Sequence, residues 1–321
     1  MRQLRKRSLL ALTLALSVAG ASAATKGGPL TMIVPAPAGS APDIVARVLA
    51  DELAPRLGQA IVIDNKPGAG GIVAVMAAKT AHPATNTLLF VHAAVATITP
   101  LTYRAAKYDL ERDFEPVAVV ADTPMLFVAN AATGPKTLAE AIALAKAKPD
   151  AVTLGSTSRG SIPHLAGVLL GQKAGVQFNN VPMSNSGQAI QAVVGGDAVV
   201  SVDGIAPLLP MVQSGRLRAL AVTSSRTLPG LEALPLAKDT VPGLELTGWF
   251  MLFAGKGTPP AEVQALNAAV AQALKSPVVV QKLQATANFP VGGSAADARA
   301  FLAREKKLWA GAVERAGLTP E

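Results

Sequence analysis

The chain has 321 residues, of which 50% are apolar, 16% charged and 4% aromatic, and none is cysteine. This length is typical of about two domains. The high apolar content, with no periodic Gly or Pro, excludes a disordered, coiled-coil or collagen-like chain. The lack of cysteine excludes disulfides, iron–sulfur clusters and thiolate-bound zinc.

The N-terminus has the features of a secretory signal peptide. A basic start precedes an apolar run over residues 9–19 and the small residues 21–23, and this order is typical of a cleaved leader. We predict cleavage after Ala23 and a periplasmic mature protein; the alternative is an uncleaved anchor, but the run is short for a membrane span. Four of the positive charges lie in the leader, so removing them lowers the net charge from +8 to +4 and gives no indication of nucleic-acid binding.

Short apolar runs alternate with amphipathic helical patterns along the rest of the chain. The run over 30–34 predicts a buried strand, and Asp43 is the predicted N-cap of the helix that follows. Further strands are predicted over 61–63, 88–91, 117–120, 125–128, 152–155, 176–181, 199–202, 217–223 and 249–254. Further helices are predicted over 70–81, 137–148, 162–174, 188–194, 261–274, from 278, and over 295–315, the last with an apolar stripe at Phe301, Leu302, Leu308, Trp309 and Val313.

The alternation of strands and helices predicts an α/β fold with parallel sheets covered on both faces. About ten short strands and a helical tail favour two doubly wound lobes. A TIM barrel is the alternative, but the spacing in the middle of the chain is too irregular for eight repeated βα units.

Motifs of the common enzyme classes are missing. There is no H-E-x-x-H, G-x-S-x-G or P-loop sequence. Ser161 and His164 stand three residues apart on one predicted helix, which does not aim a base at a nucleophile. The turn over 68–71 has Val73 where a dinucleotide loop needs glycine, so we interpret it as a chain reversal facing water or the other lobe. We predict no enzyme activity, no cofactor and no metal site.

Two loops between a predicted strand and a predicted helix are candidates for a binding site. The first spans 35–43 and the second spans 156–161. Their small residues let a ligand approach the backbone, and the N–H groups at a helix N-terminus favour an anion. Both loops follow the carboxyl ends of strands, where open α/β sheets bind ligands. One loop in each lobe predicts a cleft at the lobe interface that binds a carboxylate.

These residues also carry a resemblance to a known family. The segments 35–39 (PAPAG), 64–71 (DNKPGAGG), 160–166 (GSIPHLA) and 215–223 (GRLRALAVT), with Asp43 and Arg47, resemble those of the Bug receptors, the periplasmic solute-binding proteins of tripartite tricarboxylate transporters. The matches are collinear from residue 30 to 315, nearly the whole mature chain.

The resemblance implies a type II-like periplasmic-binding-protein fold whose lobes are joined by crossing strands and close on the ligand like a Venus flytrap. After the signal peptide predicted over 1–23, it places lobe one at 24–122 and 225–321, and lobe two at 123–224. The implied function is to capture a mono-, di- or tricarboxylate as a monomer and deliver it to a membrane permease. The alternatives are a two-lobed extracytoplasmic sensor and a secreted α/β hydrolase.

The sequence departs from the family pattern at Ser40, Ser158, 84–87 and 183–185, which makes the edge of the pocket more polar and less aromatic. No ligand identity is therefore transferred. Arg159 is either a surface residue or a clamp on a second carboxylate, and Asp203 either binds a ligand hydroxyl or amine or caps a turn. The candidate ligand-binding residues are Pro37, Ala38, Gly39, Ser40, Asp43, Ser156, Ser158, Arg159, Gly160, Ser161, His164, Ser184 and Asp203.

Overall fold

The computed structural model describes residues 28–81, 86–149 and 152–320. The predicted signal peptide and its cleavage site therefore lie outside the described residues. Within these three ranges, no helix is both long enough and apolar enough to cross a membrane.

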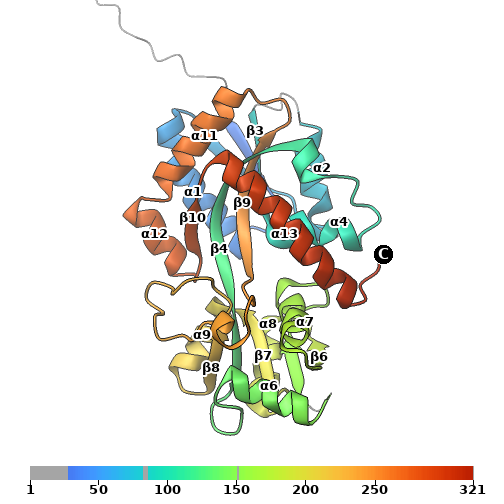
Figure 1. Cartoon of the computed structure of the whole chain (residues 1–321). Coiled ribbons are helices and arrows are strands. Elements are labelled where there is room, and N and C mark those ends of the chain that lie inside the picture. Colours follow the sequence, from blue (N-terminus) through green and yellow to red (C-terminus); the bar gives the residue numbers. More distant parts are fainter. Residues whose placement is uncertain (1–27, 82–85, 150–151, 321) are drawn as a thin grey trace, which may run out of the picture.

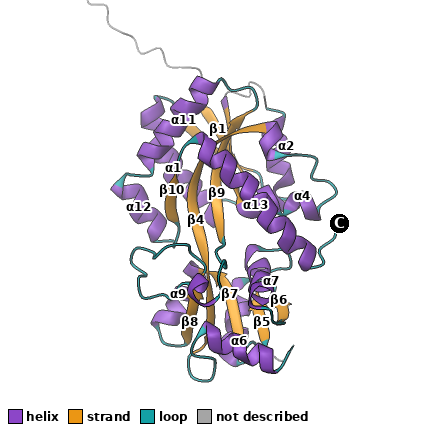
Figure 2. Ribbon diagram, in the orientation of Figure 1, coloured by secondary structure: helices purple, strands orange, loops and turns teal. Residues whose placement is uncertain are grey.

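The strands of the described residues form two sheets, one in each lobe (Figures 1 and 2). The strands are β1 (Leu30–Val34), β2 (Ile61–Asn65), β3 (Thr87–His92), β4 (Phe114–Asn130), β5 (Thr153–Ser156), β6 (Asn179–Pro182), β7 (Val200–Gly204), β8 (Leu217–Val222), β9 (Thr247–Gly255) and β10 (Phe289–Gly292). The first sheet has the order β2-β1-β3-β9-β4, with β10 also on β4. The second has the order β4-β7-β5-β6, with β8 also on β4.

Strand β4 belongs to both sheets. Its first part, to Pro124, pairs with β9, and its second part, from Met125, pairs with β7 and β8. The two strands predicted over 117–120 and 125–128 are therefore one strand of 17 residues. All of these pairings are antiparallel, as is that of β3 with β9. The prediction of parallel sheets is therefore wrong around β4 and β9, whereas β1 pairs in parallel with β2 and β3, and β5 with β6 and β7. The reason is that β4 crosses between the lobes, and the strands beside it do not reach it through a βαβ connection.

Helices cover the faces of both sheets (Figure 2). They are α1 (Ala41–Leu57), α2 (Ile72–Lys79), α3 (Ala93–Thr97), α4 (Thr99–Thr102), α5 (Leu110–Asp113), α6 (Leu138–Ala147), α7 (Ile162–Ala174), α8 (Ser186–Gly195), α9 (Ile205–Gln213), α10 (Ala237–Thr240), α11 (Pro260–Ala273), α12 (Pro277–Gln284) and α13 (Ala295–Arg315), with a 3-10 turn, η1 (Ala69–Gly71), before α2. The sequence did not predict β10, α3 to α5, α9 or α10, most of which are too short to show a period.

Two further predictions need correction. The N-cap of α1 is Ser40 and not Asp43, because the helix begins at Ala41, three residues earlier than an N-cap at Asp43 would place it. The strand predicted over 176–181 begins only at Asn179, and residues 176–178 connect α7 to it. The lobe limits at 122/123 and 224/225 remain a prediction.

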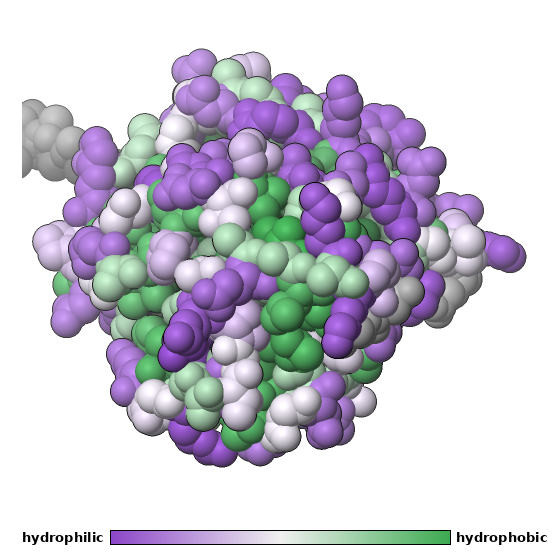
Figure 3. Space-filling model, turned by 60° about the horizontal axis from the view of Figure 1, so that its bottom comes forward, coloured by the Kyte–Doolittle hydropathy of each residue, from purple (hydrophilic) through white to green (hydrophobic). Residues whose placement is uncertain are grey.

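Helix α13 runs from the first lobe down to the second (Figure 1). Its predicted apolar stripe is confirmed: Leu302, Trp309 and Val313 are buried in the largest core cluster, and Phe301 and Leu308 pack against it. The indole N–H groups of Trp309 and of Trp249 on β9 both donate to Glu305 Oε2, each over 2.9 Å. On the face of the molecule shown in Figure 3, hydrophobic patches lie between hydrophilic side chains.

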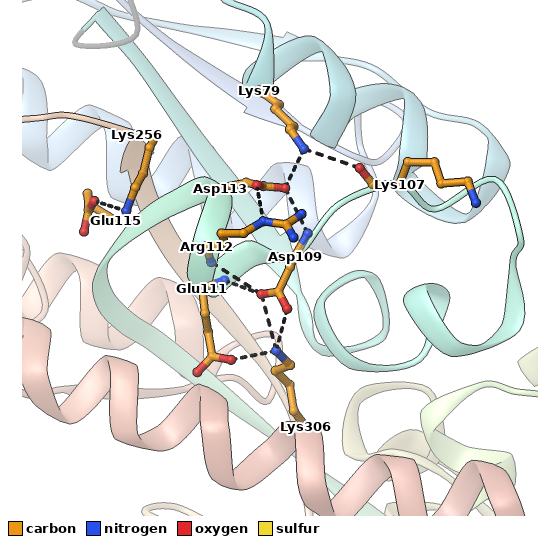
Figure 4. Close-up of polar contacts among 9 residues, drawn as sticks. All are labelled: Lys79, Lys107, Asp109, Glu111, Arg112, Asp113, Glu115, Lys256 and Lys306. Carbon is orange, nitrogen blue, oxygen red and sulfur yellow. Dashed lines mark hydrogen bonds and ion pairs between the residues drawn. The ribbon is translucent and has the colours of Figure 1, made fainter.

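A cluster of ion pairs holds α13 against the first lobe (Figure 4). Lys306 Nζ lies 3.2 Å from Asp109 Oδ2 and 2.6 Å from Glu111 Oε2, at the start of α5. Beside them, Lys79 of α2 contacts Asp113 Oδ2 at 2.7 Å. These contacts fix the middle of α13, so its C-terminal end reaches the second lobe at a defined place.

Candidate functional site

The two predicted loops face one cleft of about 750 Å³ between the lobes. First-lobe residues form most of its wall, the loop over 158–161 forms the second-lobe wall, and the chain beyond α13 closes one side. The lining residues are Pro35, Pro37, Pro67, Gly68, Gly70, Gly71, His92, Ala94, Ile98, Thr99, Thr102, Tyr103, Ser158, Arg159, Gly160, Ser161, Gly317, Leu318 and Thr319.

The lining carries positive charge but no carboxylate. Among the described residues that line the cleft, Arg159 is the one permanently charged side chain. Glycines and prolines bring the backbone to the surface, where N–H groups can meet an anion without a buried cation having to lose its water. This chemistry suits a small anion with a polar or partly apolar body.

His92 ends β3 at the first-lobe wall of the cleft. Its side chain makes no hydrogen bond within the described ranges, and burial lowers the pKa of its imidazole to about 4. The ring is therefore neutral at pH 7. It offers one N–H donor and one nitrogen acceptor to whatever occupies the cleft.

The first-lobe loop is held from behind by Asp43. Gly39, at a φ of +80°, donates its N–H to Asp43 Oδ2 over 2.8 Å. Arg47 Nε also reaches Oδ2, at 3.0 Å, and Asn65 Nδ2 reaches Oδ1, at 2.9 Å. Burial alone would raise the pKa of Asp43, but the hydrogen bonds from Arg47, Gly39 and Asn65 outweigh it, and the pKa lies below its usual value. Both carboxylate oxygens of Asp43 therefore accept hydrogen bonds from within the protein.

The second-lobe loop is held in the same way by His164. Gly160, also at a φ of +80°, donates its N–H to His164 Nδ1 over 3.2 Å. Ser161 is the N-cap of α7: its Oγ accepts the N–H of His164 at 3.2 Å and lies 2.9 Å from Thr157 Oγ1. His164 is buried, and burial together with the charge of Arg159 lowers its pKa.

The structure brings some of the predicted site residues together and not others. Pro37, Ser158, Arg159, Gly160 and Ser161 line the cleft. Outside its lining lie the exposed Ala38, Gly39 and Ser184, the half-buried Ser40, and the buried Asp43, Ser156, His164 and Asp203.

Two of these residues have partners that bear on their predicted roles. Asp203 Oδ1 accepts the N–H of Gly204 before α9, while its Oδ2 is buried without a partner in the described structure. Arg159 is exposed, and its Nη2 donates to the carbonyl oxygens of Ala316 and Gly317, 3.5 and 3.3 Å away, at the end of α13.

Sequence reasoning missed much of the first-lobe wall. The turn over 67–71 was recognised, but only as a reversal facing water or the other lobe, whereas Pro67, Gly68, Gly70 and Gly71 line the cleft. His92 could have been found from its place at the carboxyl end of a predicted strand. Residues 317–319 carry no motif, and only the path of α13 brings them to the site.

Comparison with known proteins shows close relatives of this fold. The model of a family described as "Tripartite tricarboxylate transporter family receptor" matches residues 45–318. A Rhodopseudomonas palustris protein solved with adipate is 31% identical, with a TM-score of 0.74, over 91% of this chain and 98% of that one. MatC of the same organism, solved with malate, is 29% identical, with a TM-score of 0.70, over 89% and 98%. The periplasmic binding protein BugD is 28% identical, with a TM-score of 0.71, over 92% and 100%.

These likenesses confirm the fold class predicted from the sequence, two α/β lobes of the periplasmic-binding-protein type with a cleft between them. They also confirm the resemblance that the collinear motifs indicated.

Proposed function

The chain belongs to the family of tripartite tricarboxylate transporter receptors, and on that premise we propose that it captures a small organic carboxylate in the cleft between its lobes and delivers it to a membrane permease. It does so without catalysis, as a monomer in the periplasm, after its signal peptide has been removed.

One observation carries the proposal: one loop from each lobe lines the same cleft, whose wall has one arginine and no acidic side chain. Helix α7 begins at the cleft, directly after Gly160 and Ser161, whereas the first-lobe loop lines it through Pro35 and Pro37, before α1 begins at Ala41. The dipole of α7 and the free N–H groups favour negative charge between the two loops. A carboxylate placed between them would contact both lobes and favour their closure.

The ligands of the two relatives suggest where to begin. One relative was solved with adipate and the other with malate, and both compounds are dicarboxylates. For this chain we propose a carboxylate with a polar body, because the polar residues His92 and Tyr103 line the first-lobe wall. Thr99 and Thr102 line it too, although their hydroxyls donate to the carbonyl oxygens of Gly70 and Ile98.

A thermal-shift screen followed by calorimetry tests the function. The panel contains adipate, malate and other mono-, di- and tricarboxylates, with adipamide as the uncharged control for adipate. A ligand present at 100 times its Kd stabilises the folded state by about 2.7 kcal/mol. We expect at least one acid to raise the melting temperature and adipamide to leave it unchanged. An uncharged control as effective as its acid would contradict anion recognition, and sustained consumption of a bound acid would contradict the absence of catalysis.

A further inference from the structure

Both cleft loops end in the same short sequence. Residues 39–43 read Gly-Ser-Ala-Pro-Asp and residues 160–164 read Gly-Ser-Ile-Pro-His. In each case the glycine has a φ of +80°, the serine is the N-cap and the proline lies in the first turn of the helix. The helices that follow the two cleft loops therefore start with one repeated unit, which differs at its last position.

The side chain at that last position accepts a hydrogen bond from the glycine in both lobes. The glycine N–H is donated to the side chain four residues later, to Asp43 Oδ2 at 2.8 Å and to His164 Nδ1 at 3.2 Å. A carboxylate oxygen of Asp and the Nδ1 of His both lie two bonds beyond Cβ. The shared requirement is thus an acceptor at that distance, whatever group supplies it.

The two acceptors differ in charge, but Arg47 neutralises the first of them, so both units are neutral overall. Arg47 pairs with Asp43 at 3.0 Å, and Val168 stands at the equivalent place four residues after His164. An imidazole that accepts through Nδ1 carries its proton on Nε2 and is uncharged.

The surroundings of His164 do not favour the imidazolium form. The charged side chains that share its hollow are Arg159 and Arg315, both cations. Strands β5 and β6 behind α7 carry no ionisable side chain, and Asp203 on β7 is bonded to Gly204.

We propose that His164 is a positioning residue of the second lobe, the neutral counterpart of Asp43: its Nδ1 holds the amide of Gly160 inside the loop and so fixes the backbone of residues 158–161 that faces the cleft. His164 does not contact the ligand. The part of this inference that concerns affinity rests on the proposed function, whereas the hydrogen bond itself does not.

The first test is spectroscopic and needs no ligand. In the full mature chain, NMR should show His164 protonated on Nε2 alone at pH 7, and the Gly160 amide should exchange slowly with solvent. His164→Asn keeps an acceptor two bonds beyond Cβ and should preserve the slow exchange. His164→Gln moves the acceptor one bond further, and His164→Leu removes it; both should speed exchange at least tenfold. A proton on Nδ1, or equal exchange in all four proteins, would overturn the proposal.

The second test measures affinity by calorimetry, with adipate and malate as probes. We expect His164→Asn to bind within threefold of the wild type and His164→Gln to lose at least tenfold. The first lobe is tested in the same way with Asp43→Asn, which keeps an acceptor for the Gly39 N–H, and Asp43→Leu, which removes it. Equal affinities for His164→Asn and His164→Gln, at similar melting temperatures, would overturn the role in binding. If neither acid binds the wild type, adipate and malate are the wrong ligands for this protein. The exchange measurement still decides the role of His164.

Discussion

Arg159 and Gly317 face each other across one side of the cleft, and Arg159 Nη2 donates to the carbonyl oxygen of Gly317 over 3.3 Å. Arg159 belongs to the second-lobe loop, whereas Gly317 follows α13, which the ion pairs of Lys306 hold against the first lobe. The contact therefore joins the two lobes. It gives Arg159 a role that neither a free surface residue nor a carboxylate clamp would have, because a cation at a helix C-terminus satisfies carbonyl groups that the helix leaves unpaired.

Arg159→Ala should release this contact and shift the ligand-free protein towards open forms. We expect a larger radius of gyration by small-angle X-ray scattering and a nearly unchanged melting temperature, since exposed polar contacts contribute little to stability. Arg315→Ala removes an exposed arginine from the same helix end and serves as the control. A tenfold loss of affinity, about 1.4 kcal/mol, with unchanged scattering would instead identify Arg159 as a clamp on the ligand.

Ser161→Ala should destabilise the protein by about 1 kcal/mol, the usual contribution of an N-cap side chain. Ser161 Oγ caps α7 by accepting the N–H of His164. Ser40 is the N-cap of α1, but its Oγ donates to the carbonyl oxygen of Pro37 and caps nothing. Ser40→Ala should therefore cost less than half as much in urea unfolding. Equal losses would show that the capping bond is not the source of the difference.

Gly167→Ala should destabilise the protein although alanine is the better helix former by about 1 kcal/mol. A Cβ at position 167 of α7 would lie 2.7 Å from both Asn180 Oδ1 and Leu154 Cδ2, and relieving such crowding typically costs about 1–3 kcal/mol. Gly195→Ala is the matched control in α8, where a Cβ would meet one atom, at 3.8 Å. The control should gain stability in the same unfolding measurement, and a gain for both variants would contradict the crowding.

Glu305→Gln should make the protein more stable at pH 8 and leave it nearly unchanged at pH 4. Burial raises the pKa of Glu305, and the hydrogen bonds from Trp249 and Trp309 counter only part of this effect. The folded state thus holds the proton more tightly than the unfolded state, so wild-type stability falls as pH rises from about 4.5 through the raised pKa.

The glutamine oxygen can still accept both indole N–H groups, which bond to one carboxyl oxygen in the wild type. Urea unfolding at several pH values checks this prediction, with Glu314→Gln as an exposed control on the same helix. A difference between Glu305→Gln and wild type that does not change with pH would rule out ionisation as the cause.

The two cleft loops could be predicted because their signals are local: small residues between an apolar run and an amphipathic helix. The orientation of Asp43 and His164 could not, since a sequence shows that a polar residue lies near a loop but not that it faces the glycine behind it. Asp122 and Thr123 interrupt the apolar pattern of β4, which made one crossing strand look like two. The remaining wall comes from segments far apart in the chain, and only tertiary packing brings His92 and residues 317–319 together.

The pairing of β3 with β9 and of β4 with β10 affects the order in which the protein can fold during synthesis. The first sheet lacks a central strand until Gly255 has left the ribosome, and β10 and α13 come later still. Contacts between such distant segments form slowly. A long-lived unfolded chain suits passage through a secretory channel, to which the leader predicted in residues 1–23 would direct it. Late closure of this sheet would then leave the chain unfolded, and able to pass such a channel, until its C-terminal third is made.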